Sequence, residues 1–254
     1  MHDKPVALVT GANKGIGLQI AKDLAAHGFT VLVGSRNLER GETAARSVGG
    51  DARAVQLDVT DPASVAAAAQ RIQSELARLD VLVNNAGISH AGSPGSALPD
   101  RPLKEIAQSG RLGVVSLDEV HTVFETNVFG IIAVTQALLP LLREAPAARI
   151  VNVASSGGSL TLNSDPTNPH RAMFGTYSAS KAAANAITVA FAAELDSAGI
   201  KVNAACPGFT ATDLNNFRGT RTVEQAAREP LRLALIGADG PTGTFSNEDG
   251  PLPW

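Results

Sequence analysis

The sequence has few of the residues that mark several common protein classes. It contains one cysteine, Cys206, so no intrachain disulfide can form, which favours a reducing compartment such as the cytoplasm. The 21 Lys and Arg against 24 Asp and Glu leave a net charge of −3, without the basic excess that phosphate-backbone binding needs. The 5 histidines show no metal-ligand spacing. We therefore expect no nucleic-acid partner and no catalytic metal.

Long hydrophobic runs are also missing. The most apolar stretch, residues 128–142, is too short to span a bilayer and is interrupted by Gly130, Thr135, Gln136 and Pro140. The opening MHDKPVALVT runs straight into a strand-like segment, without the charged and apolar regions of a secretory signal. We expect a soluble cytoplasmic protein with no membrane partner.

What is present is typical of one α/β domain. Hydrophobic residues make up 44% of the 254 residues and charged residues 18%, which are ordinary globular values. Ala-rich segments of helical length separate most of the short aliphatic runs, and near-continuous apolar strands require helices on both faces of a parallel sheet. A single doubly wound domain over residues 1–254 is predicted, with strands at Val6–Thr10, Thr30–Val33, Ala52–Leu57, Val81–Val83, Arg149–Val153 and Lys201–Ala205. Asp61 followed by Pro62 predicts the start of a helix after the third strand.

Two stretches break this alternation and are predicted to be long loops. They cover residues 88–115 and 157–175 and are rich in Gly, Ser and Pro. Loops of this length are often binding loops or lids, although a solvent-exposed insertion without a role fits the same pattern. Together with residues 209–229, they are where we expect substrate identity to be decided.

A glycine-rich turn follows the first strand directly. It reads Thr10-Gly-Ala-Asn-Lys-Gly-Ile-Gly17 and leads into the amphipathic segment LQIAKDLAAHG. Glycines in such a turn allow close approach of a pyrophosphate to the amide groups at a helix N-terminus. The Gly-x3-Gly-x-Gly spacing departs from the common dinucleotide fingerprint, so on its own it fits a structural turn equally well.

Further motifs follow in order: Asn84-Asn-Ala-Gly87 after the fourth strand, Tyr177-Ser-Ala-Ser-Lys181, and Pro207-Gly208 after the sixth. With the glycine turn, they resemble the short-chain dehydrogenase/reductase family over nearly the whole chain. The resemblance implies a Rossmann-type fold with a seven-stranded parallel sheet and a nicotinamide cofactor. It implies cofactor contacts at Gly11, Asn13, Lys14, Gly15, Ile16, Gly17, Asp58, Val59, Asn85, Ala86, Gly87, Tyr177, Lys181, Pro207, Gly208 and Thr212, although Asp58 could equally be a helix cap.

The end of the second strand indicates which nicotinamide cofactor is preferred. NAD enzymes place a carboxylate there for the ribose 2′-hydroxyl, and this chain has Gly34-Ser35-Arg36 instead. Arg36 and Ser35 can bind a 2′-phosphate, and Lys14 in the glycine turn can add a second positive charge. NADP(H) is the predicted cofactor. The alternative is that Arg36 and Lys14 are solvated surface charges.

The YxxxK pair suggests acid catalysis. Tyr177 and Lys181 lie four apart in a predicted helix, so they share a face. A hydride arriving at a carbonyl carbon leaves an alkoxide that needs a proton, and a free phenol of pKa about 10 is a reluctant donor. A cation at about 4 Å would lower the phenol pKa to about 7. The pair alone is common on helix surfaces, but with the family resemblance we expect Tyr177 to be the acid.

Other site residues are implied by the resemblance or by position. Ser155 matches the serine that polarises the substrate carbonyl, and Asn127 matches the helix asparagine that holds a water linked to the lysine. Cys206 is expected to be a small buried hydrophobe near the cofactor. Met173 and Phe174 are predicted to line the substrate pocket, or else simply to anchor their loop by packing.

Within the family, the chain most resembles the carbonyl reductase branch. The features that carry this likeness are Lys14, Arg36, the enlarged segment before Tyr177 and the ending PLPW. It implies NADPH-dependent reduction of a hydrophobic ketone or aldehyde. The alternatives are a specific alcohol or steroid dehydrogenase acting oxidatively, or a non-catalytic NADP-sensing protein. The family forms dimers or tetramers, whereas carbonyl reductases with an enlarged segment can be monomers.

Overall fold

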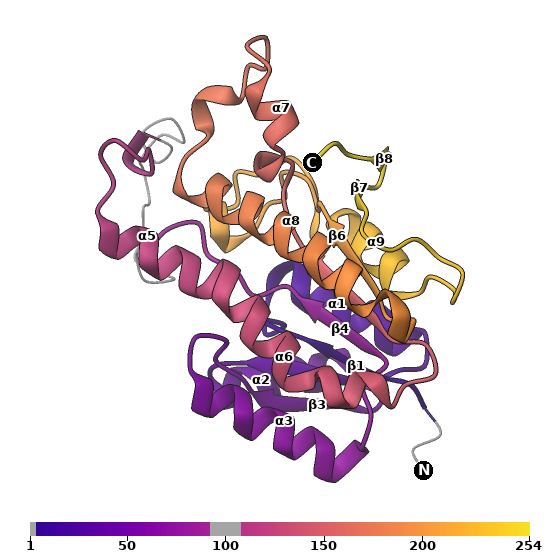
Figure 1. The fold of residues 1–254 in the computed structure, drawn as a ribbon. Helices are drawn as coiled ribbons and strands as arrows, with labels where there is room; N and C mark the ends of the chain where they lie inside the picture. The colour runs from indigo at the N-terminus through magenta and orange to yellow at the C-terminus, as the bar shows by residue number, and fades with distance from the viewer. Residues whose placement is uncertain (1–3, 92–107) are drawn as a thin grey trace.

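A computed structural model describes residues 4–91 and 108–254 and shows one sheet between two layers of helices (Figure 1). The strand order is β3-β2-β1-β4-β5-β6-β7-β8. The first seven strands pair in parallel, as predicted, and the short β8 adds an antiparallel edge to β7. The strands are β1 Val6–Val9, β2 Thr30–Ser35, β3 Ala52–Gln56, β4 Val81–Asn84, β5 Arg149–Val153, β6 Lys201–Ala205, β7 Phe245–Asn247 and β8 Gly250–Pro251.

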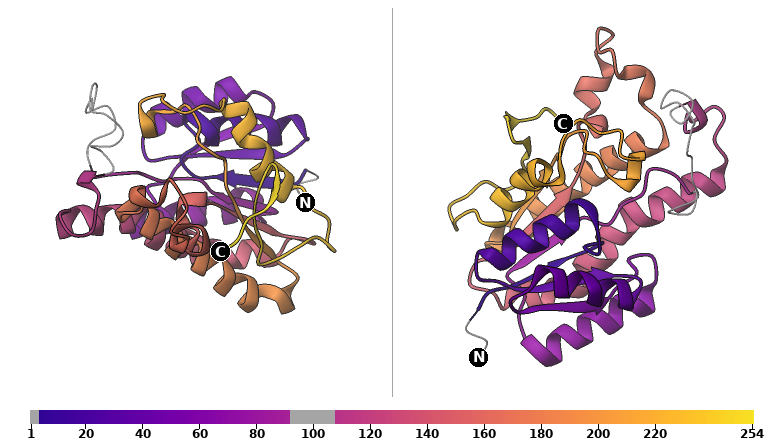
Figure 2. Two further views of the ribbon diagram at one scale, coloured as in Figure 1. Left: turned by 90° about the horizontal axis from the view of Figure 1, so that it is seen from above. Right: turned by 180° about the vertical axis from the view of Figure 1, so that it is seen from behind.

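Helices cover both faces, and the further views agree on the layering (Figure 2). On one face lie α1 Gly15–Ala26, α2 Leu38–Val48 and α9 Val223–Ala234. On the other lie α3 Pro62–Leu76, α6 Gly130–Arg143 and α8 Thr176–Leu195. Strands β1, β4 and β5 are buried at every position, which explains their near-continuous apolar sequences.

Local signals set several helix starts. Asp61 caps α3 by accepting the Ala63 N–H at 2.9 Å, and Pro62 occupies the first helical position, as the sequence predicts. Asn37 caps α2 by accepting the Arg40 N–H at 2.8 Å. These caps fix where the chain turns away from the carboxyl ends of β2 and β3.

One long helix crosses the second face. It runs from α5 Leu117–Phe124 through a π-helical turn, Glu125–Phe129, into α6. By length and composition alone, this helix of 27 residues could cross a membrane, because it contains an 18-residue window of mean hydropathy 1.4, but 44% of that window is buried inside the domain. The sequence analysis judged residues 128–142 alone too short to span a bilayer. The sequence pattern did not show that α5 continues into α6, so this judgement does not extend to the whole helix.

The predicted loops contain more structure than their composition suggests. Residues 157–175 include α7 Leu160–Ser164 and a 3-10 turn at Arg171–Met173. Residues 209–229 include the turn Asp213–Asn215 and the start of α9, whose N-cap is Thr222. Of the predicted loop 88–115, residues 92–107 lie outside the described part of the chain. Ser159 caps α7 and Thr222 caps α9 through their side chains, whereas the turn Arg171–Met173 has no side-chain cap.

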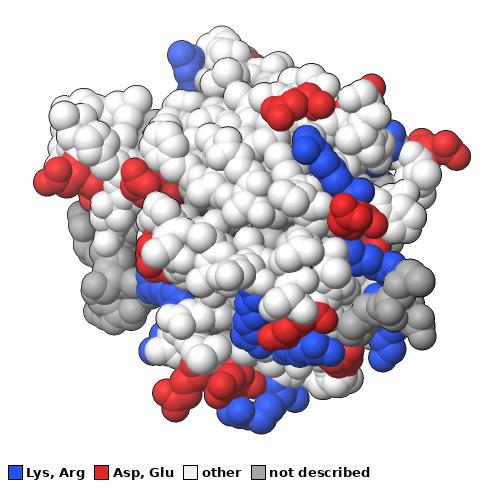
Figure 3. Space-filling view, turned by 60° about the horizontal axis from the view of Figure 1, so that its bottom comes forward, with Lys and Arg blue, Asp and Glu red and all other residues white. Residues whose placement is uncertain are grey.

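Surface charges lie in groups of mixed sign around a broad uncharged area on the face seen in Figure 3. An example of such mixing is Arg53, which contacts Asp51 at 3.1 Å and Glu75 at 3.7 Å. Exposed pairs of this kind contribute little to stability. The fold rests on the two apolar layers instead.

Candidate active site

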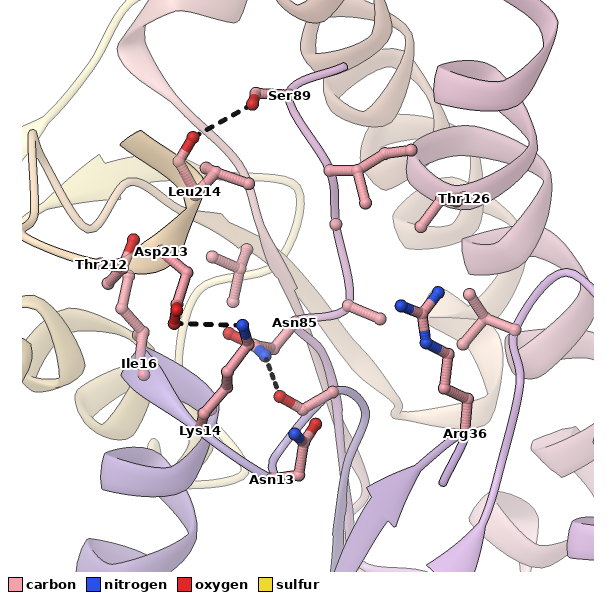
Figure 4. Close-up of a pocket in the computed structure, with 18 of the residues that line it drawn as sticks. Asn13, Lys14, Ile16, Arg36, Asn85, Ser89, Thr126, Thr212, Asp213 and Leu214 are labelled. Carbon is pink, nitrogen blue, oxygen red and sulfur yellow. Dashed lines mark hydrogen bonds and ion pairs between the residues drawn. The ribbon is translucent and has the colours of Figure 1, made fainter. Parts of the chain in front are cut away.

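A cavity of about 710 Å³ lies at the carboxyl ends of the parallel strands (Figure 4). This is where doubly wound sheets bind ligands. The predicted site residues that line it are Gly11, Asn13, Lys14, Gly15, Ile16, Gly17, Ser35, Arg36, Asp58, Val59, Asn85, Ala86, Gly87, Tyr177, Lys181, Pro207 and Thr212.

The glycine turn forms a close-fitting cradle at the start of α1. Gly11 and Gly15 adopt positive φ angles of 63° and 59°, which glycine tolerates best. A Cβ on Gly17 would lie 2.4 Å from Asn85 Nδ2 and 2.8 Å from the Gly11 carbonyl oxygen, so the turn packs too tightly for a side chain. No side chain caps the α1 N-terminus and its first turn has no acid. The residues present therefore fit a pyrophosphate.

The turn after β4 is tied to the glycine turn. Thr10 Oγ1 accepts the N–H groups of Asn85 at 3.0 Å and Ala86 at 2.9 Å, and Asn85 Nδ2 donates to the Thr10 carbonyl at 2.8 Å. Asn84 Nδ2 donates to Asn152 Oδ1 at 2.9 Å, which links β4 to β5. These bonds hold the central strand ends in register beneath the cavity.

Basic side chains lie at two places around the cavity. Arg36 points into it from the end of β2, and no hydrogen bond or ion pair of its guanidinium is found in the described residues (Figure 4). Arg40 also lines the cavity. Lys14 instead pairs with Asp213 at 3.1 Å, and Ser35 is buried with its hydroxyl donating to the Asn37 carbonyl at 2.8 Å. Among the described residues that line the cavity, Arg36 and Arg40 are thus the basic side chains available to a phosphate.

Asp58 serves a turn and lines the cavity. Its Oδ1 accepts the Thr60 N–H at 3.0 Å and the Thr60 hydroxyl at 2.7 Å. The cap of α3 is Asp61, so the alternative that Asp58 is a helix cap is wrong. Its carboxylate keeps the chain after β3 folded against the cavity wall.

Three predicted catalytic side chains come together. The Ser155 side chain lies close enough to Tyr177 to lower the pKa of its phenol, and Ser155 Oγ accepts the Gly157 N–H at 3.1 Å. Lys181 Nζ lies 5.9 Å from the Tyr177 ring centre and donates to the Val153 carbonyl at 2.7 Å. The group joins the end of β5 to the first turns of α8, and Tyr177 is the only tyrosine in the chain.

Burial dominates the electrostatics of this group. It raises the pKa of Tyr177 from 10.0 to about 12; the nearby Cys206 acts in the same direction and the Ser155 hydrogen bond opposes it. Burial also lowers the pKa of Lys181 from 10.5 to about 8, against the effect of Cys206. The expectation that Lys181 brings the phenol pKa near 7 is therefore wrong for this structure, because dehydration prevails and the ammonium faces the Val153 carbonyl.

Asn127 lies in the π-helical turn between α5 and α6 and is fully buried. Its Nδ2 donates to the Ile88 carbonyl at 2.8 Å and to Ser180 Oγ at 3.0 Å, and its Oδ1 accepts the Ile88 N–H at 2.9 Å. Its side chain therefore holds the segment after β4 against α8, next to Lys181. Single π-turns are frequent at functional sites.

Some predicted residues lie elsewhere. Gly208 is not among the lining residues; a Cβ there would meet Arg221 Cδ at 2.5 Å. Met173 and Phe174 do not line the large cavity, and Phe174 borders a separate hollow with Arg111 and Arg171. The reason is that Thr176 donates its N–H to the Gly110 carbonyl at 2.8 Å, which turns the preceding residues toward that hollow. Cys206 is buried, as expected, and its Sγ accepts the Ser156 N–H at 3.1 Å.

Other lining residues were not predicted from the sequence. Arg40 could have been found from its place in the first turn of a helix that starts just after Arg36. Ser89, whose Oγ donates to the Leu214 carbonyl at 3.1 Å, and Asp213 carry no sequence signal, because loop contacts bring them to the cavity (Figure 4).

A pyrophosphate cradle and a partly buried Tyr-Ser-Lys group at one doubly wound sheet define a dinucleotide-dependent oxidoreductase. The family model described as short chain dehydrogenase matches residues 5–222. The chain belongs to this family.

Several characterised proteins are similar over almost their full length. A (-)-isopiperitenone reductase from Mentha piperita is 35% identical, with 97% of each chain covered. The structure of salutaridine reductase from Papaver somniferum has a TM-score of 0.78 at 28% identity, covering 95% of this chain and 99% of that one. The NADPH-bound carbonyl reductase from chicken fatty liver has a TM-score of 0.78 at 27% identity, covering 99% of both. Such likeness places the chain beside the carbonyl reductases of the family.

Proposed function

We propose that the protein is an NADPH-dependent carbonyl reductase that converts a ketone or aldehyde to an alcohol. The observation that carries this proposal is one cavity lined both by Tyr177 and Lys181 and by the cations Arg36 and Arg40. The reductases among the similar proteins, one of them bound to NADPH, support it.

The chemistry follows from the residues beside the cavity. Bound NADPH would supply a hydride to the carbonyl carbon. The Ser155 hydroxyl stabilises the negative charge that develops on the carbonyl oxygen. Tyr177, with a pKa of about 12, is protonated at neutral pH and donates its proton to that oxygen. Lys181, with a pKa of about 8, can pass a proton on to the phenolate.

The preference for NADPH rests on charge. Arg36 and Arg40 can each make charge-assisted hydrogen bonds to a 2′-phosphate, worth roughly 1.5–3 kcal/mol apiece. The end of β2 offers no carboxylate for a ribose 2′-hydroxyl, because its last residue is Ser35 and Arg36 follows. NADPH should therefore be preferred over NADH by at least about tenfold.

The substrate we propose is a hydrophobic small molecule. Ile88, Val153 and Leu214 line the cavity and give it apolar surface. Binding sites of this type orient a largely apolar ligand with a few polar groups. Here the polar groups are the Tyr177 hydroxyl, which lines the cavity, and the Ser155 hydroxyl close to it.

The test is consumption of NADPH and NADH by the purified protein with a panel of ketones and aldehydes. We expect turnover with NADPH, and we expect Arg36→Asp to erase or invert the cofactor preference. Arg46→Asp is the matched control, because Arg46 lies in the last turn of α2 away from the cavity. Equal kcat/KM for the two cofactors in the unmodified protein would refute the NADPH assignment, and no turnover with any carbonyl would refute the reductase.

A further inference from the structure

Residues 159–174, here named the α7 segment, connect the neighbourhood of Ser155 to that of Tyr177. In Figure 1 this segment rises away from the body of the domain. None of the residues of α7 is buried, and Leu160 is 62% exposed. Many of its hydrogen bonds are internal, such as Asn163 Nδ2 to the Ser159 carbonyl at 2.7 Å. Core packing of α7 therefore does not fix the segment in place.

Two hydrogen bonds reach from the segment to a distant part of the chain, and both end on one atom. The carbonyl oxygen of Trp254 accepts the Thr161 N–H at 2.8 Å and the Ser159 hydroxyl at 3.2 Å. Ser159 is fully buried and is also the N-cap of α7, accepting the Leu162 N–H at 3.1 Å. Within residues 4–91 and 108–254, no other hydrogen bond ties the segment to a distant element.

Trp254 is itself firmly held. Its ring stacks on Phe245 of β7, with centroids 5.5 Å apart and planes at 21°. It packs with Leu252 against a small buried cluster of Ala154, Ala204, Cys206 and Phe245. Ala154 precedes Ser155, and Cys206 lies close enough to Tyr177 to raise its pKa. The anchor and the catalytic group therefore share one support.

We propose that Trp254 is a positioning residue for substrate selection. Stacked on Phe245, it holds its carbonyl where the first turn of α7 needs an acceptor, and so it fixes the α7 segment relative to Ser155 and Tyr177. The proposal rests on the proposed function for its kinetic consequence, because the segment joins the two residues that would hold the substrate carbonyl. Substrates large enough to touch the segment depend on the anchor, and small ones do not.

The first readout needs no activity. Trp254→Ala removes the stacking, and Trp254→Phe keeps an aromatic ring for Phe245. Hydrogen exchange of a peptide covering residues 157–175 should be faster in Trp254→Ala, by about tenfold if both anchoring bonds are lost, and close to normal in Trp254→Phe. Leu252→Ala is the matched control, because Leu252 packs on the same cluster, whereas the two bonds to the α7 segment are made by the Trp254 carbonyl. Unchanged exchange in Trp254→Ala overturns the proposal.

The second readout is the ratio of kcat/KM for a bulky cyclic ketone to that for a small aliphatic ketone. Trp254→Ala should change this ratio by about tenfold, mainly through KM of the bulky ketone, with unchanged NADPH affinity and with recovery in Trp254→Phe. An equal change in Leu252→Ala, or a parallel loss of NADPH affinity, would show general loss of packing and overturn the proposal. If the unmodified protein reduces no ketone, the proposed function fails, while the exchange readout still decides whether Trp254 anchors the segment.

Discussion

Replacing Lys181 by Met should make the protein more stable at neutral pH while abolishing turnover. The pKa of Lys181 is lowered from 10.5 to about 8, and each tenfold loss of proton affinity corresponds to 1.36 kcal/mol, so the buried ammonium costs about 3 kcal/mol at pH 7. Met loses the hydrogen bond to the Val153 carbonyl, which costs about 1–2 kcal/mol. The net expectation is a gain of about 1–2 kcal/mol, or a melting temperature higher by a few degrees.

The pH dependence gives this prediction its sign. Because the folded-state pKa is depressed, the penalty is fully present below pH 8 and is relieved as pH rises toward 10.5, falling to about 1 kcal/mol by pH 10. At pH 10 the advantage of Lys181→Met should therefore vanish or reverse. Urea unfolding followed by circular dichroism at pH 7 and pH 10 measures both values. A variant less stable at pH 7, or a difference that does not change with pH, would refute the reasoning.

Three other predictions can be checked on the same material. Tyr177 is the only tyrosine, so its ionisation can be followed by ultraviolet difference absorbance, and the phenol should be less than half ionised at pH 10. A titration midpoint at or below pH 10 would contradict the effect of burial on its pKa. Tyr177→Phe should bind NADPH but lose turnover. Gly17→Ala should displace Asn85, lower the free energy of unfolding by about 1–3 kcal/mol and weaken NADPH binding, whereas Gly113→Ala, with open space around it, should do neither. Phe174→Ala should leave the selectivity between bulky and small ketones unchanged in kcat/KM assays, because Phe174 borders the separate hollow.

The sequence predicted the sheet well because its strands are buried on both faces. Strands β5 and β6 match the predicted bounds, and Asp61 with Pro62 marked the start of α3 correctly. In such strands the apolar run and the strand coincide, so local composition is enough. The eighth strand escaped prediction because Gly250–Pro251 has neither length nor apolar pattern.

The candidate site was predictable where motifs determine backbone shape, and less so where loops supply side chains. The glycine turn and the YxxxK pair lie around the expected cavity. Lys14 was expected at the 2′-phosphate, but Asp213, which is remote in sequence, pairs with it. The sequence predicted Met173 and Phe174 at the substrate pocket because they closely precede Tyr177 in the chain. A hydrogen bond from the Thr176 N–H to the Gly110 carbonyl instead turns this stretch toward the separate hollow. Contacts of this kind depend on the packing of two loops, which no local pattern encodes.

Burial, which raises the pKa of Tyr177 where Lys181 was expected to lower it, favours reduction over oxidation. An oxidative reaction needs the Tyr177 phenolate as a base, and forming it at pH 7 against a pKa of about 12 costs about 7 kcal/mol. A reductive reaction begins with the protonated phenol and carries no such cost. Lys181, with a pKa of about 8, lies close to neutrality and so can give up a proton to the phenolate that reduction leaves behind. Dehydration thus moves the two pKa values apart and makes the Lys181 ammonium a stronger acid than the Tyr177 phenol. That order suits an acid that must be reloaded after each turnover, and it makes the oxidative alcohol or steroid dehydrogenase the weaker alternative.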